Sequence, residues 1–332
     1  MALLGGTGGN RRVSQRLRGI RGVETVTRNQ LRFVELAALG RNAWWLYLLS
    51  LGMIVATAYL IAQFGVWALL NVGQVEAIAL IFEAPSVQAD APLDQRIMVF
   101  AARMWPFVSF LVAMIVIVPL VHGRSWRTLI HRPQGFNWPA FFTSTFFAVL
   151  LPLSAIAALV WETGETFPVQ FDPFVFIVFG AAILALIPLQ VLAEEMFFRG
   201  YMMQGLAHFT ESTLVRLLIP AAVFAALHFG NREVIEGGIG VMGFYFLLAI
   251  YLGILALVGN GLEYSIGMHL GQNLYVALLV SPIDSSLDTP SIIRTEAEVI
   301  GPFVVLGTAL LYVIHFALTF SSAAIINWSR RR

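Results

Sequence analysis

The chain has 332 residues, of which 58% are hydrophobic and only 12% are charged, and its mean hydropathy is +0.80. Soluble domains are about 45–50% apolar and about 25% charged, so this composition excludes an ordinary soluble domain and indicates a protein that crosses a membrane several times. The absence of cysteine excludes disulfide bonds, thiolate metal ligands and a cysteine nucleophile. The formal net charge is +1, which gives no reason to expect a nucleic-acid partner.

Residues 1–43 form a polar, basic segment that we expect on the cytoplasmic side of the membrane. The segment holds eight arginines and lacks the early apolar core of a signal peptide. Val13, Leu17, Ile20 and Val23 recur at helical spacing among those arginines, which predicts a helix lying on an anionic leaflet. A solvated basic tail that only sets the topology is an equal alternative.

Eight apolar runs follow, each of about the length that crosses a bilayer core of roughly 30 Å. They cover residues 44–70, 97–121, 140–160, 174–194, 214–229, 241–258, 262–280 and 301–326. The sequence therefore predicts an all-α integral membrane protein, a bundle of about eight transmembrane helices. We expect one membrane domain over residues 44–327 and a basic cytoplasmic C-terminus at 328–332.

The charged loops indicate how this bundle is oriented. Arginines gather in the N-terminal segment, in the 122–133 loop and at the C-terminus, whereas the alternate loops are acidic. Because an excess of Lys and Arg marks the cytoplasmic side, eight spans with both termini in the cytoplasm satisfy the pattern. The expected location is the bacterial inner membrane.

Ionisable residues inside the predicted spans are few, and each is by default a hypothesis of a functional site. They are Glu194, Glu195, Arg199, His228, His269 and His315. A lone histidine on an apolar helix is more often bound to a backbone carbonyl than catalytic, and we interpret His315 in this way. The remaining histidines, His122, His131 and His208, fall in predicted loops, where we expect them to face water.

The spacing of the two adjacent glutamates predicts two different roles. Glu195 and Arg199 are four residues apart, in the acid-before-base order that favours an ion pair on one helix face. Glu194 is rotated by about 100° from Glu195, so it can stay free of Arg199. A free carboxylate in an apolar pocket suits a general base. A neutralised ion pair near the inner interface, without further role, is the competing interpretation.

Two histidines and one amide complete the candidate site. His269 and Asn273 are again four residues apart, in "HLGQN", and His228 ends the string "FAALH". If these side chains converge with Glu194, they supply a base for water, donors for an oxyanion, or ligands for a metal.

The three motifs together resemble a known family. "EEMFFRG" at 194–200, "FAALH" at 224–228 and "HLGQN" at 269–273 have the order and form EExxxR, FxxxH and HxxxN. This is the pattern of the CAAX protease and bacteriocin-processing (CPBP) family of intramembrane proteases, to which the type II CAAX prenyl endopeptidase belongs. The resemblance covers about residues 174–280 and implies an interior polar cavity in which a peptide bond is hydrolysed.

The resemblance also implies a role for each motif residue. Glu194 activates the attacking water with the assistance of His228, and His269 and Asn273 polarise the scissile carbonyl and stabilise the oxyanion. The expected partners are the lipid bilayer and a peptide or protein substrate at the membrane, prenylated or not.

Glu195 and Arg199 are then a supporting pair that fixes the fourth predicted span. Zinc is the one cofactor that these residue types suggest, with Glu194, His228 and His269 as its ligands. The sequence lacks an HExxH motif, and we favour hydrolysis without a metal.

Two other classes of function stay open at this stage. A non-catalytic scaffold or bacteriocin-immunity-type protein leaves the intact Glu, His and Asn set unexplained. A proton-coupled transporter accounts for buried Glu and His residues, but the sequence shows no inverted repeat or pair of broken helices.

The expected spans leave one conflict of depth. Glu194 lies at the cytoplasmic end of the 174–194 span, whereas His228 lies about 20 Å along the 214–229 span. For the two to meet, the fourth helix must continue toward Leu206, or the fifth must begin later.

Overall fold

The computed structural model describes residues 30–71, 92–164, 167, 169, 171–282, 285–287, 289–295 and 302–329. The helix expected around Val13 to Val23 lies outside these residues. The predicted all-α character is confirmed for the part of the chain that the structure describes, with one small addition. Two three-residue strands, β1 (Val280–Pro282) and β2 (Ile293–Thr295), pair in parallel, with Val280 opposite Ile293.

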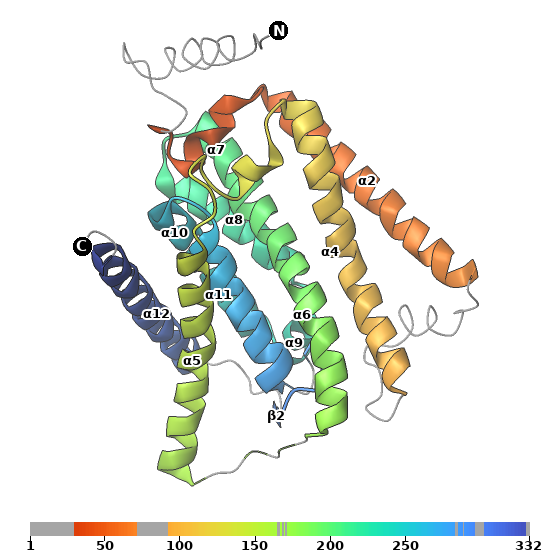
Figure 1. Ribbon diagram of the computed structural model, residues 1–332, viewed down its shortest axis with the longest axis vertical. Coiled ribbons are helices and arrows are strands. Elements are labelled where there is room, and N and C mark those ends of the chain that lie inside the picture. Colours follow the sequence, from red (N-terminus) through yellow and green to blue (C-terminus); the bar gives the residue numbers. More distant parts are fainter. Residues whose placement is uncertain are drawn as a thin grey trace.

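Long helices make up most of the described chain (Figure 1). In chain order they are α2 (Trp44–Asn71), α4 (Leu93–His122), α5 (Trp138–Thr163), α6 (Pro173–Glu195), α8 (Thr213–Leu227), α10 (Ile239–Gly259), α11 (Glu263–Leu274) and α12 (Pro302–Ser329). The shorter helices are η2 (Phe33–Leu39), η3 (Trp126–Leu129), α7 (Met203–Phe209) and α9 (Arg232–Gly237), and two π-helical turns are η4 (Met196–Met202) and η5 (Tyr275–Leu279).

Each of the eight predicted apolar runs coincides with one of the long helices. Within the described residues, five helical stretches are long and apolar enough to cross a membrane: Trp44–Ala68, Leu93–His122, Trp138–Thr163, Pro173–Phe209 and Ile239–Gly259. This supports an integral membrane protein.

Local sequence signals fix where the site-bearing helices begin. Asp172 accepts hydrogen bonds from the backbone N–H groups of Phe174 and Val175, and Pro173 occupies the first position of α6. Ser212 caps α8 in the same way through the N–H of Val215. Such side chains satisfy N–H groups that the first turn of a helix leaves without partners.

The fourth predicted span is longer than expected. The boundary at residue 194 is wrong, because α6 continues without a break through η4 and α7, from Pro173 to Phe209, over 37 residues. At about 1.5 Å per residue this stretch exceeds a bilayer core of roughly 30 Å. Glu194 therefore lies in the middle third of this stretch instead of at its end. This longer fourth helix is the first of the two ways in which Glu194 could reach the depth of His228.

Helix α11 lies inside the bundle between α5 and α6 (Figure 1). It approaches α5 closely because Gly267 and Gly271 face that helix: a Cβ at Gly267 would lie 2.4 Å from the Phe141 carbonyl oxygen, and one at Gly271 would lie 2.6 Å from the Cβ of Ala148. Small residues at this spacing allow membrane helices to pack backbone against backbone.

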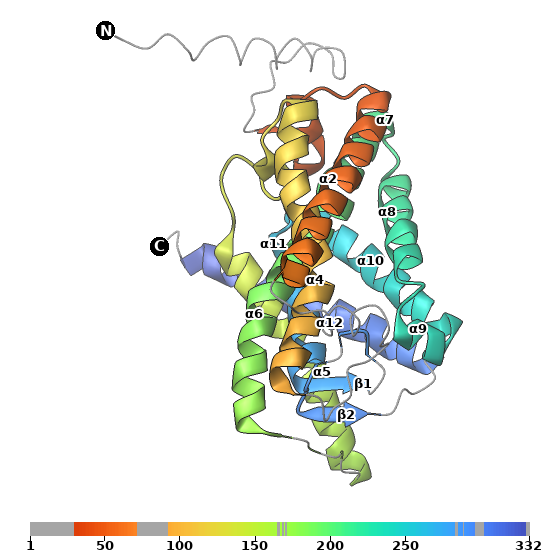
Figure 2. The ribbon, with the colours of Figure 1, turned by 90° about the vertical axis from the view of Figure 1, so that its right-hand side faces the viewer.

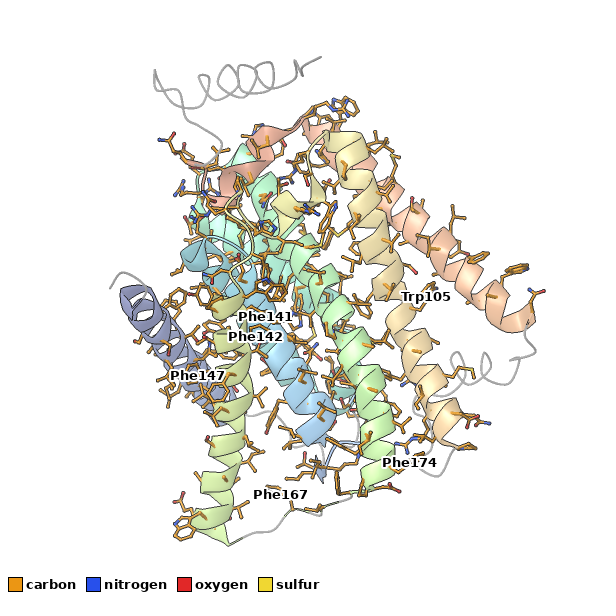
Figure 3. All side chains as sticks on the ribbon, in the orientation of Figure 1. Trp105, Phe141, Phe142, Phe147, Phe167 and Phe174 are labelled. Atoms are coloured by element: carbon orange, nitrogen blue, oxygen red, sulfur yellow. The ribbon has the colours of Figure 1, made fainter. Side chains whose placement is uncertain are left out.

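Apolar side chains also cover the outside of the bundle (Figure 3). Phe142 on α5 is 61% exposed and Phe174 on α6 is 69% exposed. In a soluble protein such a surface would promote aggregation, whereas lipid tails solvate it.

The two ends of the bundle differ in structure: the strands lie at one end, and η2 packs on α7 at the other (Figure 2).

Candidate active site

An ion pair buried between the helices anchors the candidate site. Glu195 is fully buried, and its Oε1 accepts hydrogen bonds from Arg199 Nη1 at 2.7 Å and from His269 Nδ1 at 2.8 Å. Its Oε2 accepts a hydrogen bond from the Ser265 hydroxyl. Arg199 Nη2 donates to the carbonyl of Ala249 on α10 at 2.9 Å. The predicted pair of Glu195 and Arg199 thus forms, and it joins α6, η4, α10 and α11.

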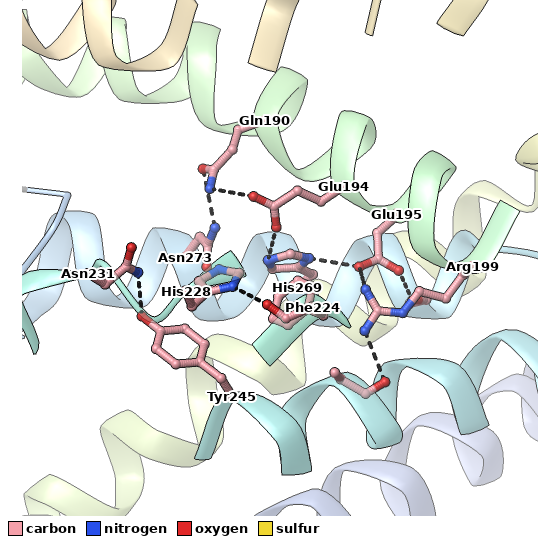
Figure 4. Close-up of polar contacts among 12 residues, drawn as sticks. Gln190, Glu194, Glu195, Arg199, Phe224, His228, Asn231, Tyr245, His269 and Asn273 are labelled. Atoms are coloured by element: carbon pink, nitrogen blue, oxygen red, sulfur yellow. Dashed lines mark hydrogen bonds and ion pairs between the residues drawn. The ribbon is translucent and has the colours of Figure 1, made fainter. Parts of the chain in front are cut away.

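His269 lies between the two adjacent glutamates (Figure 4). Its Nδ1 faces Glu195, and its Nε2 lies 3.5 Å from Glu194 Oε2. The side chain is 3% exposed. Since Nδ1 donates to a carboxylate, Nε2 is the ring nitrogen that is directed at Glu194.

Glu194 is held differently from its neighbour. It is 7% exposed, and its Oε1 accepts a hydrogen bond from Gln190 Nε2 at 3.2 Å. Its Oε2 is buried and has no hydrogen-bond partner among the described residues, although His269 Nε2 faces it. A buried carboxylate oxygen is normally hydrogen-bonded. An oxygen without a partner can accept a proton from another molecule.

The cluster contains two carboxylates, Glu194 and Glu195, and one guanidinium, that of Arg199. A buried charge without a partner costs several kcal/mol. Arg199 pairs with Glu195, and the basic group that faces Glu194 is His269, through Nε2.

Asn273 reaches the cluster through a residue that the sequence analysis did not identify. Its Nδ2 donates to Gln190 Oε1 at 3.4 Å, and Gln190 in turn donates to Glu194 (Figure 4). Asn273 lies one turn beyond His269 on α11. Its second amide N–H has no hydrogen-bond partner within the described residues.

His228 is the predicted site residue with the least direct contact. It follows the last residue of α8, and its Nδ1 donates to the carbonyl of Phe224 at 2.7 Å. No hydrogen bond joins it to Glu194 within the described residues. It is connected by aromatic rings instead: the Phe224 ring centroid lies 4.3 Å from that of His228 and 6.1 Å from that of His269.

The suggested zinc ligands do not form a ligand group. Among the residues that the structure describes, no three His, Cys, Asp or Glu side chains lie close enough together to hold a metal ion. Glu194 and His269 are near each other, but within the described residues no hydrogen bond or ion pair joins His228 to either of them. The Glu, His and His set does not fit a zinc site, and the chemistry below uses no metal.

The three histidines that we expected to face water differ in their exposure. His122 was expected to face water, but it is fully buried at the end of α4, with Nε2 3.0 Å from Ser50 Oγ and 3.1 Å from the Tyr201 hydroxyl. Ser50 and Tyr201 are distant in the chain, so no local pattern around His122 predicts these contacts. His208 is exposed, as expected, and His131 is half-buried.

His315 has the partners expected of a structural histidine. It is buried, its Nε2 donates to the carbonyl of Ser144 at 2.9 Å, and its Nδ1 accepts from the Tyr251 hydroxyl at 2.6 Å. Both nitrogens are occupied by neutral groups within the fold.

Two contacts of the site had a sequence signal that went unused. Gln190 precedes Glu194 by four residues, and Ser265 precedes His269 by four residues. Residues at this spacing lie on the same helix face. A polar side chain one turn before a predicted site residue is therefore the sequence signal for both Gln190 and Ser265.

Comparisons with known proteins agree with the motifs. Residues 173–275 match the family model described as type II CAAX prenyl endopeptidase, Rce1-like, which confirms the resemblance that the three motifs predicted. The uncharacterized protein YyaK of Bacillus subtilis (strain 168) is 25% identical over 263 residues, which cover 74% of this chain and 81% of YyaK. No solved structure matches the chain.

Proposed function

We propose that this chain, which carries an Rce1-like type II CAAX prenyl endopeptidase domain over residues 173–275, is an intramembrane protease that hydrolyses a peptide bond with a water activated by Glu194. The family match supports the reaction class. The single observation that supports the mechanism is the buried Oε2 of Glu194, which has no hydrogen-bond partner among the described residues and faces His269 Nε2.

The reaction needs a base and an acid at different stages. Glu194 removes a proton from water as the water oxygen bonds to the scissile carbonyl carbon. The resulting tetrahedral intermediate collapses, the C–N bond breaks, and the proton passes from Glu194 to the leaving nitrogen. A positioned carboxylate in this role contributes about 10²–10⁴-fold to rate.

The developing oxyanion requires hydrogen-bond donors. Protonated His269 offers its Nε2–H, while Glu195 stabilises the imidazolium through Nδ1. Asn273 offers its second amide N–H. His228, with Nδ1 bound to a carbonyl, has Nε2 free to assist the water. Removing one oxyanion donor costs about 10²–10³-fold in other hydrolases.

The substrate class follows from where the site lies. The catalytic cluster is enclosed by apolar helices, so a water-soluble globular protein has no simple access to it. We propose a membrane-associated or lipidated peptide as the substrate. We further propose eight membrane crossings with both termini in the cytoplasm, which the arginine-rich 122–133 loop supports.

Purified protein in nanodiscs, incubated with membrane-associated peptides in ¹⁸O-labelled water, tests this function. Mass spectrometry should find a new C-terminal carboxylate carrying one ¹⁸O atom, and none with Glu194→Ala. Cleavage that continues unchanged in Glu194→Ala contradicts the mechanism. The absence of cleavage with the wild type over a broad peptide library favours the scaffold alternative.

A further inference from the structure

The orientation of His228 is not determined by its own helix. It is the residue after the last turn of α8, is half-buried, and has one imidazole hydrogen bond, to the Phe224 carbonyl, within the described residues. A residue at the end of a helix lacks the hydrogen bonds that hold the interior turns. The ring orientation therefore depends on what packs against it.

Tyr245 of α10 packs against this imidazole. The ring centroids of Tyr245 and His228 are 4.3 Å apart, and the ring planes are inclined by 30° (Figure 4). Phe224 lies at the same distance from His228 but belongs to α8, the helix that His228 directly follows. Tyr245 comes from a different helix, so it fixes the imidazole relative to the rest of the bundle.

The hydroxyl of Tyr245 is held by two hydrogen bonds to residues other than His228. It donates to Glu233 Oε1 and accepts from Asn231 Nδ2 at 3.0 Å. The backbone N–H of Asn231 donates to the carbonyl of His228 at 3.0 Å. Because its proton is given to Glu233, the tyrosine hydroxyl has no proton to offer a substrate. Tyr245 is therefore suited to position His228 and not to catalyse.

The second oxygen of Glu233 binds a segment beyond the helices. Glu233 Oε2 accepts from the backbone N–H of Ser286 at 2.9 Å and from its hydroxyl at 2.6 Å. Ser286 lies between β1 and β2. Asn231 Nδ2 also donates to Glu233 Oε1 at 3.2 Å, so one carboxylate takes four hydrogen bonds. Hydrogen bonds to a charged acceptor are about twice as strong as neutral ones. It holds Tyr245, Asn231 and the 285–287 segment together.

We infer that Tyr245 is a positioning residue for His228, and that Glu233 anchors Tyr245 and couples it to the 285–287 segment. This inference rests on the proposed function insofar as His228 assists the attacking water. Tyr245 needs its ring to orient the imidazole and its hydroxyl to hold the ring in place.

The matched control is Tyr251, on the same helix. Its ring stacks on Tyr312 at 4.5 Å between centroids, and its hydroxyl binds His315 at 2.6 Å. Tyr245→Leu and Tyr251→Leu remove the same atoms from α10, one beside His228 and one away from it. Tyr245→Phe and Glu233→Gln keep the stacked ring and weaken only its anchor.

Two measurements in nanodiscs test the inference. Tyr245→Leu should lower kcat by about 10–100-fold with KM changed less than about twofold, Tyr245→Phe and Glu233→Gln should lower kcat by roughly threefold, and Tyr251→Leu should keep kcat within about twofold. In ¹³C-histidine NMR, the ring C–H resonance of His228, assigned with His228→Gln, should move in Tyr245→Leu as the ring current is lost. It should stay in place in Tyr251→Leu.

A wild-type kcat in Tyr245→Leu, or a His228 resonance that does not move there, overturns the inference. If wild-type protein cleaves no peptide, the proposed function fails separately. The resonance then still decides whether Tyr245 orients His228.

Discussion

Two buried histidines lie on neighbouring helices of this protein, and their partners are opposite in character. His269 is 3% exposed and His315 is 1% exposed. His315 is bound by a tyrosine hydroxyl and a backbone carbonyl, which are neutral. His269 lies between two carboxylates, one of which has an oxygen without a partner.

The difference shows why burial alone does not identify a catalytic histidine. Both imidazole nitrogens of His315 have neutral hydrogen-bond partners within the fold, so the ring gains nothing from a substrate. The His269 region contains an acceptor, Glu194 Oε2, that is buried and has no hydrogen-bond partner among the described residues. A buried polar atom of this kind is uncommon and calls for an explanation, of which a catalytic role is one.

The largest expected difference is in activity between the two histidine variants. His269→Ala should lower kcat/KM by about 10²–10⁴-fold, because it removes an oxyanion donor and the proton partner of Glu194. His315→Ala should stay within about threefold of wild type and lower the free energy of unfolding by about 1–3 kcal/mol. Peptide cleavage and Tm, measured on the same preparations, check both. Equal losses of activity would contradict the assignment.

The second expected effect is on stability at the ion pair. Arg199→Met should lower the free energy of unfolding by about 3–5 kcal/mol, because it leaves Glu195 buried without its cation. Arg32→Met is the control, since the pair of Arg32 and Glu35 is 2.8 Å long but has an arginine side chain that is 60% exposed. That pair should contribute about 0–1 kcal/mol. Thermal unfolding in one detergent compares the two, and a similar small loss in both would show that the buried pair has no special weight.

The third expected effect is on the link between the base and the amide. Gln190→Leu should lower kcat about tenfold, because Glu194 and Asn273 lose their shared partner, which corresponds to about 1.4 kcal/mol. Gln272→Leu is the matched control on α11, where the one side-chain hydrogen bond of Gln272 within the described residues is a long one, of 3.4 Å, from the Tyr312 hydroxyl. Steady-state kinetics of both variants measure this, and a control variant that is as slow as Gln190→Leu would refute a specific role.

The smallest expected difference is in the free energy of unfolding of two serine variants, one beside each histidine. Ser265→Ala removes a hydrogen bond to the charged Glu195, at about 1.5–3 kcal/mol of stability, whereas Ser144→Ala removes a neutral one, to the Tyr264 carbonyl, at about 0.5–1.5 kcal/mol. Chemical or thermal unfolding ranks them. The reverse order would mean that the charge on Glu195 is not maintained.

Sequence alone went furthest where the pattern is local. The i,i+4 spacing predicted the pair of Glu195 and Arg199, and apolar run lengths located the long helices within a few residues. It failed at the end of the fourth span, because the mostly buried residues from Met196 to Met202 continue the helix as a π turn, which α7 then extends to Phe209. Whether the helix continues there depends on packing against other helices, and the length of an apolar run contains no information about packing.

Distant pairings were the other failure. The buried contacts of His122 and the ring of Tyr245 against His228 join residues far apart in the chain, and no spacing rule predicts them. The three family motifs predicted that Glu194, His269 and Asn273 belong together. They did not indicate that Asn273 is connected through Gln190.

The adjacent glutamates allow the most direct test of the central claim. Glu194→Gln and Glu195→Gln change neighbouring carboxylates to isosteric amides, and both variants can be measured for peptide cleavage and Tm in one nanodisc preparation. We predict that Glu194→Gln keeps a Tm near that of wild type and loses about 10²–10⁴-fold in kcat. For Glu195→Gln we predict that the main loss is a lower Tm. Full activity in Glu194→Gln would contradict the account.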